Sequence, residues 1–256
     1  MRFRVSLIFV FLFASCSFGQ RFKKDTSKIT SWKSHKVPKN QKEFLKYNYD
    51  LDGWNVFIEN KVVKVKRFST KTTDSTLKAL LNINKDGKTD LSYIKGEDGY
   101  LVGLNHGEFG GEIRWYSNEG KIIKSKKGLK IRQFIKRDSE IYAIQGLNHM
   151  GLSYGSIITV RYSNKEYFPE EYLKLPNAPE AAILDSNNTF WIITSQSILS
   201  VKPDKTIQII LNHCFWQNGL YPNSIVLNNN VIYAGMRGGV FKYNLKTKKQ
   251  EWLLPN

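Results

Sequence analysis

The feature that most constrains this chain is a repeat of about 43 residues. The tetrapeptide Gly-Leu-Asn-His occurs at residues 103–106 and again at 146–149, 43 positions later. Each copy follows a run of β-branched and aromatic residues and precedes a second run of the same kind. Such runs are typical of short strands, and the glycines between them are typical of turns. The chain is therefore expected to repeat one all-β unit.

The repeat extends beyond the two tetrapeptides. Aromatic residues at equivalent strand positions are spaced 42, 49 and 42 residues apart, at Tyr100, Tyr142, Trp191 and Tyr233. Turn residues before the following strand are spaced 44, 42 and 42 apart, at Gly111, Gly155, Ser197 and Gly239. A weaker unit lies upstream, with strands at 54–58 and 62–65. A period in the low forties built of strands and turns predicts a β-propeller, and residues 41–256 are long enough for five four-stranded blades.

The segment 185–194 carries the most recognisable blade sequence. It has an aspartate, an Asn-Asn turn, a Trp-Ile pair and a threonine in succession. This arrangement resembles β-propellers with two-component-regulator-type or quinoprotein-like repeats, over roughly residues 41–256. The resemblance implies the fold and leaves the activity open, because such propellers carry many unrelated functions.

Turn signals and helix signals agree with an all-β chain. Residue pairs that favour positive φ separate the strand patterns at Asp86-Gly87, Asp98-Gly99, Asn187-Asn188, Asn218-Gly219 and Gly238-Gly239. Residues 75–81 fit either one turn of helix or an outer strand. Residues 20–40 form a basic leader, and one interpretation is that this region adds a strand beside residues 250–254 and closes the ring.

The first residues are typical of an export signal. Arg2 and Arg4 precede an apolar stretch of ten residues, 5–14, which is too short to span a bilayer. Cleavage after Gly19 predicts a mature protein that begins at Gln20. Alternatively, residues 13–16 resemble a lipobox, which would leave residues 1–15 as the signal and a lipid anchor on Cys16. Both interpretations place the protein outside the cytoplasm, either secreted or periplasmic, or lipid-anchored in the envelope of a bacterium.

Charge and cysteine content limit the partners. The formal net charge is +17, and residues 121–137 carry eight Lys or Arg and no acid. We expect this run to lie on an outer strand and the connection that follows it, and to attract anions without specificity, because lysine lacks the bidentate geometry of arginine. Nucleic acid is a poor candidate for an exported protein.

Cys214 is the single cysteine after the signal, so it is expected to be a buried small hydrophobe in a monomer without an internal disulfide.

One face is expected to carry the function. In a propeller, the loops between second and third strands and those between blades emerge on the same side. The residues predicted there are His106, Glu108, Phe109, His149, Tyr154, Gln196, His213, Trp216 and Arg237. Aromatic and polar side chains of this kind are typical of sites that bind sugars or peptides.

Three functions remain open for this face. The first is non-enzymatic binding of a glycan, a peptide or an acidic envelope polymer, without metal or cofactor. The alternative is a small metal-dependent lyase or hydrolase that uses His106, Glu108 and His149. In the third, these residues have structural roles in turns. The repeat favours histidines that lie far apart, each facing its own loop backbone.

Overall fold

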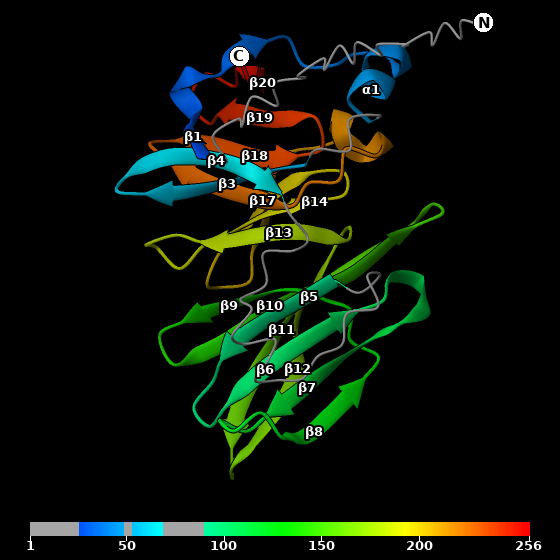
Figure 1. Ribbon diagram of the computed structural model, residues 1–256, viewed down its shortest axis with the longest axis vertical. Coiled ribbons are helices and arrows are strands. Elements are labelled where there is room, and N and C mark those ends of the chain that lie inside the picture. Colours follow the sequence, from blue (N-terminus) through cyan, green and yellow to red (C-terminus); the bar gives the residue numbers. More distant parts are fainter. Residues whose placement is uncertain (1–25, 49–52, 69–89) are drawn as a thin grey trace, which may run out of the picture.

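The computed structural model describes residues 26–48, 53–68 and 90–256. Within these ranges the regular structure is mainly β-strand, arranged in five antiparallel sheets (Figure 1). The prediction of an all-β propeller with about five blades is confirmed. The signal segment with Cys16, residues 75–81 and the Asp86-Gly87 pair lie outside the described residues. No helix in the described ranges is long and apolar enough to cross a membrane.

Three sheets contain four strands each, paired in sequence order. The first comprises β5 (Asp90–Lys95), β6 (Tyr100–Asn105), β7 (Gly111–Tyr116) and β8 (Ile122–Lys127). The second comprises β9 (Ile131–Arg137), β10 (Glu140–His149), β11 (Leu152–Ser163) and β12 (Glu166–Leu175). The third comprises β13 (Pro179–Leu184), β14 (Phe190–Thr194), β15 (Ile198–Val201) and β16 (Ile207–Leu211). As predicted, the four repeated aromatic residues lie in the second strand of their sheets: Tyr100, Tyr142, Trp191 and Tyr233.

The two remaining sheets include strands from the N-terminal region. One is ordered β17-β18-β19-β20-β2, with β17 (Ser224–Asn228), β18 (Val231–Met236), β19 (Gly239–Asn244), β20 (Gln250–Leu254) and β2 (Lys33–His35). The other is ordered β1-β4-β3, with β1 (Thr26–Lys28), β3 (Gly53–Glu59) and β4 (Val62–Phe68). Lys33 pairs with Leu254, so β2 adds a fifth strand beside β20. The β-sheets therefore include residues upstream of residue 41, which the repeat had suggested as the start of the propeller.

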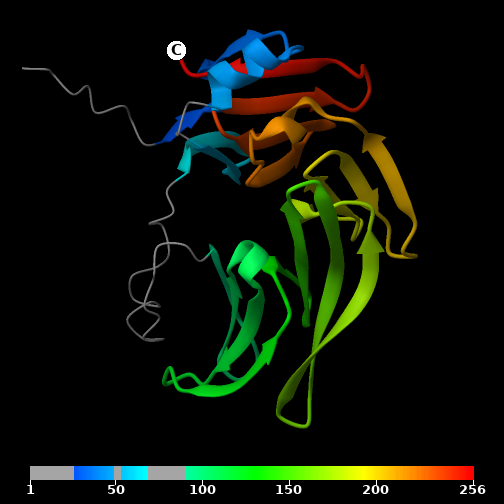
Figure 2. The same cartoon turned by 90° about the vertical axis from the view of Figure 1, so that its right-hand side faces the viewer.

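The sheets follow one another in an arc, which Figure 2 shows from the side. Their innermost strands pack in the order β5, β9, β13, β17 and β3. Side chains connect these strands at three junctions. Ser92 Oγ of β5 accepts from Phe134 N at 3.2 Å, and Ser224 Oγ of β17 accepts from Val56 N at 2.9 Å. Between β9 and β13, the Gln133 amide both donates to and accepts from the backbone of Ala182. These contacts satisfy backbone N–H groups that have no ladder partner where one sheet meets the next.

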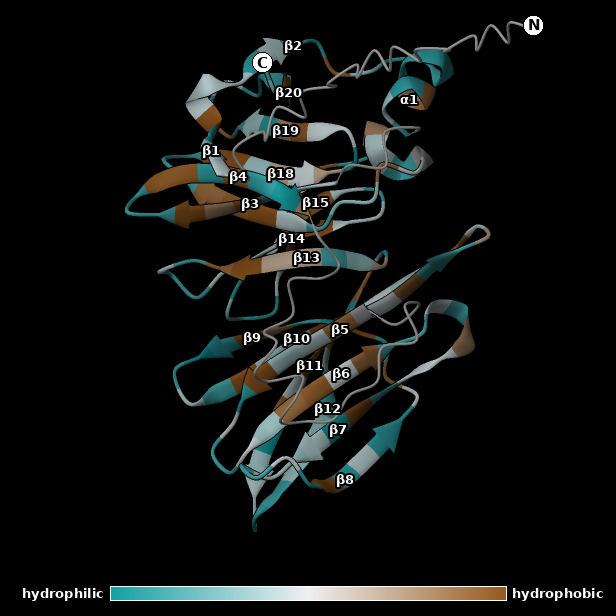
Figure 3. Cartoon of the chain, in the orientation of Figure 1, coloured by the Kyte–Doolittle hydropathy of each residue, from teal (hydrophilic) through white to brown (hydrophobic). Residues whose placement is uncertain are grey.

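The hydrophobic core is divided among the interfaces between neighbouring sheets. Leu101, Ile113 and Trp115 meet Ile141 and Ile158 between the sheets of β5–β8 and β9–β12. A second cluster joins β9–β12 to β13–β16, and a third joins the β17–β20 sheet to β3 and β4. In Figure 3 the brown stretches lie along strands inside the sheets, and the connections between strands are mostly teal. One sheet cannot bury both of its faces, so each depends on its neighbours.

The two Gly-Leu-Asn-His copies do not form the same loop, which corrects the sequence prediction. In the first copy β6 ends at Asn105, and a 3-10 turn, η2 (Gly107–Phe109), follows with Gly107 and Gly110 at φ 62° and 108°. In the second copy β10 continues through His149 and turns at Met150-Gly151. Paired strand therefore replaces most of the loop predicted for residues 146–155. The residues after the tetrapeptide differ: Gly107 and Gly110, both at positive φ, follow the first copy, whereas the second continues into a tight turn at Met150-Gly151.

Two short helical segments were not predicted at all. Helix α1 (Gln41–Asn48) begins with a capping box, in which Asn40 Oδ1 accepts from Glu43 N at 3.0 Å and Glu43 Oε2 accepts from Lys39 N at 2.8 Å. The segment η1 (Ile29–Ser31) lies between β1 and β2. A further 3-10 segment, η3 (Phe215–Asn218), occupies the predicted long connection between β16 and β17. The Asn-Gly pair at 218–219 therefore ends a helical turn and does not form a hairpin.

Candidate functional site

The predicted face contains a cavity of about 330 Å³, called here the central pocket. Its walls come from the end of α1, the β10–β11 hairpin, β13, the β14–β15 turn and the segment around η3. The side chains and turns that line it are Asn48, Asn148, His149, Met150, Gly151, Glu180, Ser195, Trp216, Gln217, Gly219, Tyr221 and Pro222. Five segments of the chain thus contribute to one polar cavity.

Hydroxyl groups hold two walls of the central pocket together. Ser153 Oγ of β11 lies 2.8 Å from Ser195 Oγ and accepts from Ala178 N at 2.9 Å. The backbone N–H of Ser195 donates to Ala178 O at 2.9 Å. These bonds link the β10–β11 hairpin to the β14–β15 turn, so the positions of Asn148 and Ser195 are coupled.

Arg237 supports the opposite wall. Its Nη1 donates to Asn48 O at 3.2 Å and to Asn48 Oδ1 at 2.8 Å, and its guanidinium carbon lies 4.6 Å from the centre of the Tyr221 ring. The contact fastens the last residue of α1 and orients Tyr221, whose ring is 56% exposed. Arg237 does not itself line the central pocket. The sequence analysis placed Arg237 among the loop residues of the predicted face. In the structure, its contacts position Asn48 and Tyr221, which do line the pocket.

The structure brings two of the predicted residues together. Glu108 Oε2 of η2 lies 2.5 Å from His149 Nε2 of β10, and both side chains are about half exposed. The Nε2 atom is itself shielded from solvent and has no other hydrogen-bond partner among the described residues. The contact is an ion pair when His149 is protonated. The expectation that His149 faces only its own loop is therefore wrong.

Neither of the other two predicted histidines lines the central pocket. His106 is the residue before η2, where its backbone N–H donates to Gly110 O at 3.0 Å. His213 is exposed at φ 50° and does not line the central pocket. Among the described residues, no three His, Cys, Asp or Glu side chains are grouped as a metal site would require.

Trp216 and Cys214 belong to the core. Trp216 is 1% exposed, and its Nε1 donates to Thr194 O at 3.0 Å. Trp216 is therefore not an exposed aromatic residue, although it contributes to the lining of the central pocket: η3 turns the indole inward against Phe241, at a ring distance of 5.1 Å. Cys214 is buried as expected, and burial raises the pKa of its thiol to about 12, which removes it as a nucleophile.

The remaining predicted residues lie at the edge of the face. Phe109 is 85% exposed at η2, and Tyr154 is half exposed beneath Lys130, whose Nζ lies 5.9 Å from the ring centre. Gln196 is half buried, and its carbonyl accepts from Cys214 N at 2.8 Å. None of the three lines the central pocket.

Sequence reasoning missed the residues of the innermost strands. A second cavity of about 410 Å³, called here the inner channel, lies among β3, β9, β13 and β17 and shares Glu180 with the central pocket. The Glu180 carboxyl group is 8% exposed and lies 3.6 Å from Arg132 Nη2. A buried carboxylate requires a charged or hydrogen-bonding partner, so this pair gives the site a defined polar floor. The sequence did carry a signal for this pair, because two consecutive repeats each have a charged residue in their first strand, Arg132 in β9 and Glu180 in β13.

Comparison with known proteins gives likeness of fold alone. No family model matches the chain, and no curated protein matches it. A streptogramin B lyase structure is 20% identical, covers 68% of this chain and 57% of its own, and has a TM-score of 0.44. A catalytically inactive virginiamycin B lyase from Staphylococcus aureus, solved with quinupristin, is 18% identical over 68% and 58%, with a TM-score of 0.44.

A third similar structure is the extracellular domain of a hybrid two-component system from B. thetaiotaomicron. It is 15% identical and covers 66% of this chain and 22% of its own, with a TM-score of 0.46. This chain therefore matches well under two thirds of the length of each of these proteins. Identities and scores at this level say nothing about a shared activity.

Proposed function

We propose that this protein is a non-enzymatic binding module whose central pocket takes an uncharged saccharide unit. The observation that carries the proposal is the set of polar side chains around the pocket. Asn48, Asn148 and Gln217 offer amides, Ser195 offers a hydroxyl group, and Glu180 offers a carboxylate. Each can donate to or accept from sugar hydroxyl groups. The volume of about 330 Å³ is in the range of small-ligand sites.

Tyr221 adds the apolar surface that a sugar ring needs. Its exposed ring lines the central pocket and is held from the other side by the Arg237 guanidinium group. An aromatic face beside convergent hydrogen-bonding groups suits a ring that is apolar on its faces and polar at its edge.

Charge favours a neutral saccharide over the acidic polymers also considered. Glu180 lines the pocket, and Glu108 lies beside His149 at its rim. Two carboxylates at the site disfavour a polyanion, and the lysine-rich strand β8 belongs to a different sheet from the pocket walls.

The test is binding of purified protein to an array of neutral and acidic bacterial and plant oligosaccharides, followed by calorimetry of the best neutral ligand. Asn148→Ala and Tyr221→Ala should each weaken binding by about fivefold or more, the loss of one hydrogen bond or one ring contact. Gln208→Ala is the matched control, because Gln208 is exposed on β16 and away from the pocket. Binding confined to acidic glycans or to peptides would refute the proposal.

Catalysis is the second candidate, and the Glu108–His149 contact is the observation in its favour. A carboxylate beside an imidazole is an arrangement used in general acid–base chemistry. If the bound saccharide is cleaved, Glu108→Gln should abolish product formation and leave binding of the substrate nearly unchanged, because Glu108 does not line the central pocket. Absence of product from every bound oligosaccharide would leave binding as the function.

Export remains part of the proposal. The basic residues Arg2 and Arg4 before the apolar stretch 5–14 support it. We expect the mature protein to begin at Gln20, or at a lipidated Cys16, and to act as a monomer in the bacterial envelope or outside the cell. Mass spectrometry of the protein recovered from its native host tests this, and an intact Met1 on folded protein would contradict it.

A further inference from the structure

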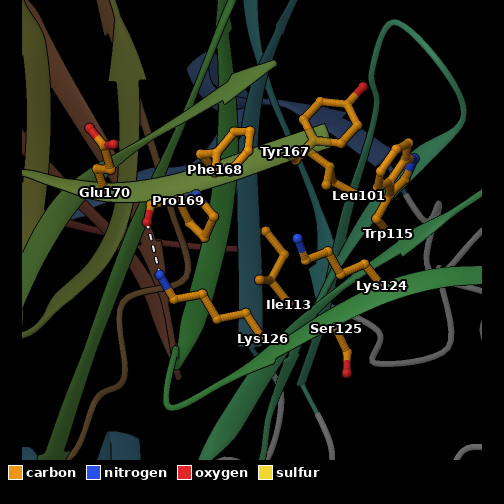
Figure 4. Close-up of a pocket in the computed structure, with 10 residues that line it drawn as sticks. All are labelled: Leu101, Ile113, Trp115, Lys124, Ser125, Lys126, Tyr167, Phe168, Pro169 and Glu170. Carbon is orange, nitrogen blue, oxygen red and sulfur yellow. Dashed lines mark hydrogen bonds between the residues drawn. The ribbon is translucent and has the colours of Figure 1, made fainter. Parts of the chain in front are cut away.

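A third cavity shares no lining residue with the central pocket and lies between two outer strands, β8 and β12. It has a volume of about 290 Å³ and is enclosed by β7 and β8 of one sheet and β12 of the next. We call it the inter-sheet pocket, and Figure 4 shows its walls. Neither the sequence analysis nor the proposed function accounts for it.

The floor of the inter-sheet pocket is apolar and aromatic. Leu101 and Ile113 form its base, and Trp115 and Tyr167 form one wall, with their rings edge to face at 5.0 Å. All four side chains are almost fully buried, whereas Phe168 on the rim is 40% exposed. A surface of this kind binds an apolar chain by excluding water from it.

Two lysine side chains cross the inter-sheet pocket from β8 to β12. Lys126 Nζ donates to Pro169 O at 3.1 Å, the dashed line in Figure 4, and Lys124 Nζ lies 2.5 Å from Glu166 Oε2. Lys124 and Lys126 alternate with Ser125, which points away from the cavity in the same view. The aliphatic parts of both lysines thus cover the apolar floor, and both amines sit at its mouth.

The amines retain capacity for a ligand. An ammonium group has three donors, and each of these amines donates to one oxygen atom among the described residues. The exposed Ile122 lies on the same strand, and Figure 3 shows β8 hydrophobic at one end and hydrophilic along the rest. The mouth is therefore cationic and the interior apolar, which is complementary to a molecule with one anionic group and one hydrocarbon chain.

We propose that the inter-sheet pocket binds a medium-chain fatty acid. The hydrocarbon chain replaces the lysine side chains over Ile113 and Trp115, and the carboxylate accepts from Lys124 Nζ and Lys126 Nζ. A carboxylate fits better than a phosphoglycerol group, because the cavity is small and Glu166 and Glu170 stand on β12 beside its mouth.

The test uses 10-bromodecanoate, whose bromine quenches tryptophan fluorescence at short range, at concentrations below its micellar limit. Titration should give saturable quenching of part of the emission, since the chain has six tryptophans and Trp115 lines this pocket. Trp115→Phe should remove that part. Lys124→Gln and Lys126→Gln should each weaken binding by about tenfold, the effect of losing one charge-assisted hydrogen bond. 10-Bromodecanol, which lacks the charge, should also bind about tenfold more weakly.

Lys127→Gln is the matched control, because Lys127 follows on the same strand and does not line the cavity. It should bind 10-bromodecanoate as the unmodified protein does. Circular dichroism of each variant confirms that the sheets are intact. Absence of saturable quenching, quenching that survives Trp115→Phe, or unchanged affinity in the Lys124→Gln/Lys126→Gln double variant would each overturn the proposal. Tighter binding of lysophosphatidylglycerol than of decanoate, measured by competition, would overturn the carboxylate assignment.

Discussion

Glu108 and His149 meet across two neighbouring sheets, with Glu108 Oε2 and His149 Nε2 2.5 Å apart. Glu108 follows the first Gly-Leu-Asn-His tetrapeptide, and His149 ends the second. The two repeats are thus in contact through His149, the last residue of the second tetrapeptide, and Glu108, which lies two residues after the first. This contact joins η2 to the β10–β11 hairpin at the rim of the central pocket.

We expect the Glu108–His149 pair to contribute modestly to stability. Both side chains are about half exposed, and pairs of this kind are worth about 0.2–1 kcal/mol. A double-mutant cycle with Glu108→Gln and His149→Ala, measured by urea unfolding, should give a coupling energy in this range. A coupling of several kcal/mol would contradict the exposed geometry.

Trp216→Ala should destabilise the fold rather than weaken ligand binding alone. The side chain is fully buried and packs against Phe241 and Phe215. Removing a buried tryptophan costs about 3–5 kcal/mol. Urea unfolding measures this loss, and Phe109→Ala is the control, because Phe109 is 85% exposed and should change stability by less than about 0.5 kcal/mol.

Arg237→Met should loosen α1 from the face. The variant retains an aliphatic side chain but loses both hydrogen bonds to Asn48 and the charge over the Tyr221 ring. We expect a loss of about 1–3 kcal/mol in the free energy of unfolding, and faster amide hydrogen exchange in α1 than in β18. Equal exchange in α1 before and after the substitution would show that other contacts hold the helix.

Cys214 should make stability fall at alkaline pH. Burial raises the pKa of its thiol from 9.0 to about 12 in the folded protein, so the folded state keeps a proton that the unfolded state releases. The thiol therefore contributes stability below pH 9, and this is lost as the pH rises from about 9 toward 12, by at most about 1.4 kcal/mol per pH unit. Comparison of unfolding at pH 8 and pH 10 for Cys214→Ala and the unmodified protein isolates the effect from that of the tyrosines. Equal pH dependence in the two proteins would contradict it.

Glu251 should make stability fall in acid. Its carboxylate accepts from Ser34 Oγ at 2.6 Å and pairs with Lys242 Nζ at 2.9 Å, contacts that lower its pKa from 4.5 to about 2. A lowered folded pKa stabilises the protein above pH 4.5, and this contribution disappears as the pH falls toward 2. At pH 7, Glu251→Gln should cost about 1–3 kcal/mol.

The difference in the free energy of unfolding between Glu251→Gln and the unmodified protein should shrink as the pH falls from 4.5 through about 2, where the Glu251 carboxyl group of the folded protein takes up its proton. Glu170→Gln serves as the control, because Glu170 pairs with Arg161 on an exposed surface and should cost little at either pH. The Ser34 contact also links β2 to β20, so loss of the Glu251 carboxylate should increase hydrogen exchange in β2 before the other strands.

The repeat by itself determined the all-β class, the number of sheets and the side of the molecule on which the loops gather. Period and turn chemistry are local properties, and Tyr100, Tyr142, Trp191 and Tyr233 accordingly occupy equivalent strands. Helix α1 also had a local signal in its capping box, Asn40 and Glu43, which an all-β expectation obscured.

Only the tertiary structure decided which of the loop residues meet. The rotation from one sheet to the next places Glu108 against His149 and leaves His213 apart, and no spacing along the chain encodes that rotation. Burial was decided in the same way: η3 turns Trp216 into the core, because the indole gains more from contact with Phe241 than from exposure to water. The buried Arg132–Glu180 pair and the lysines over Trp115 likewise depend on strands from different sheets coming together.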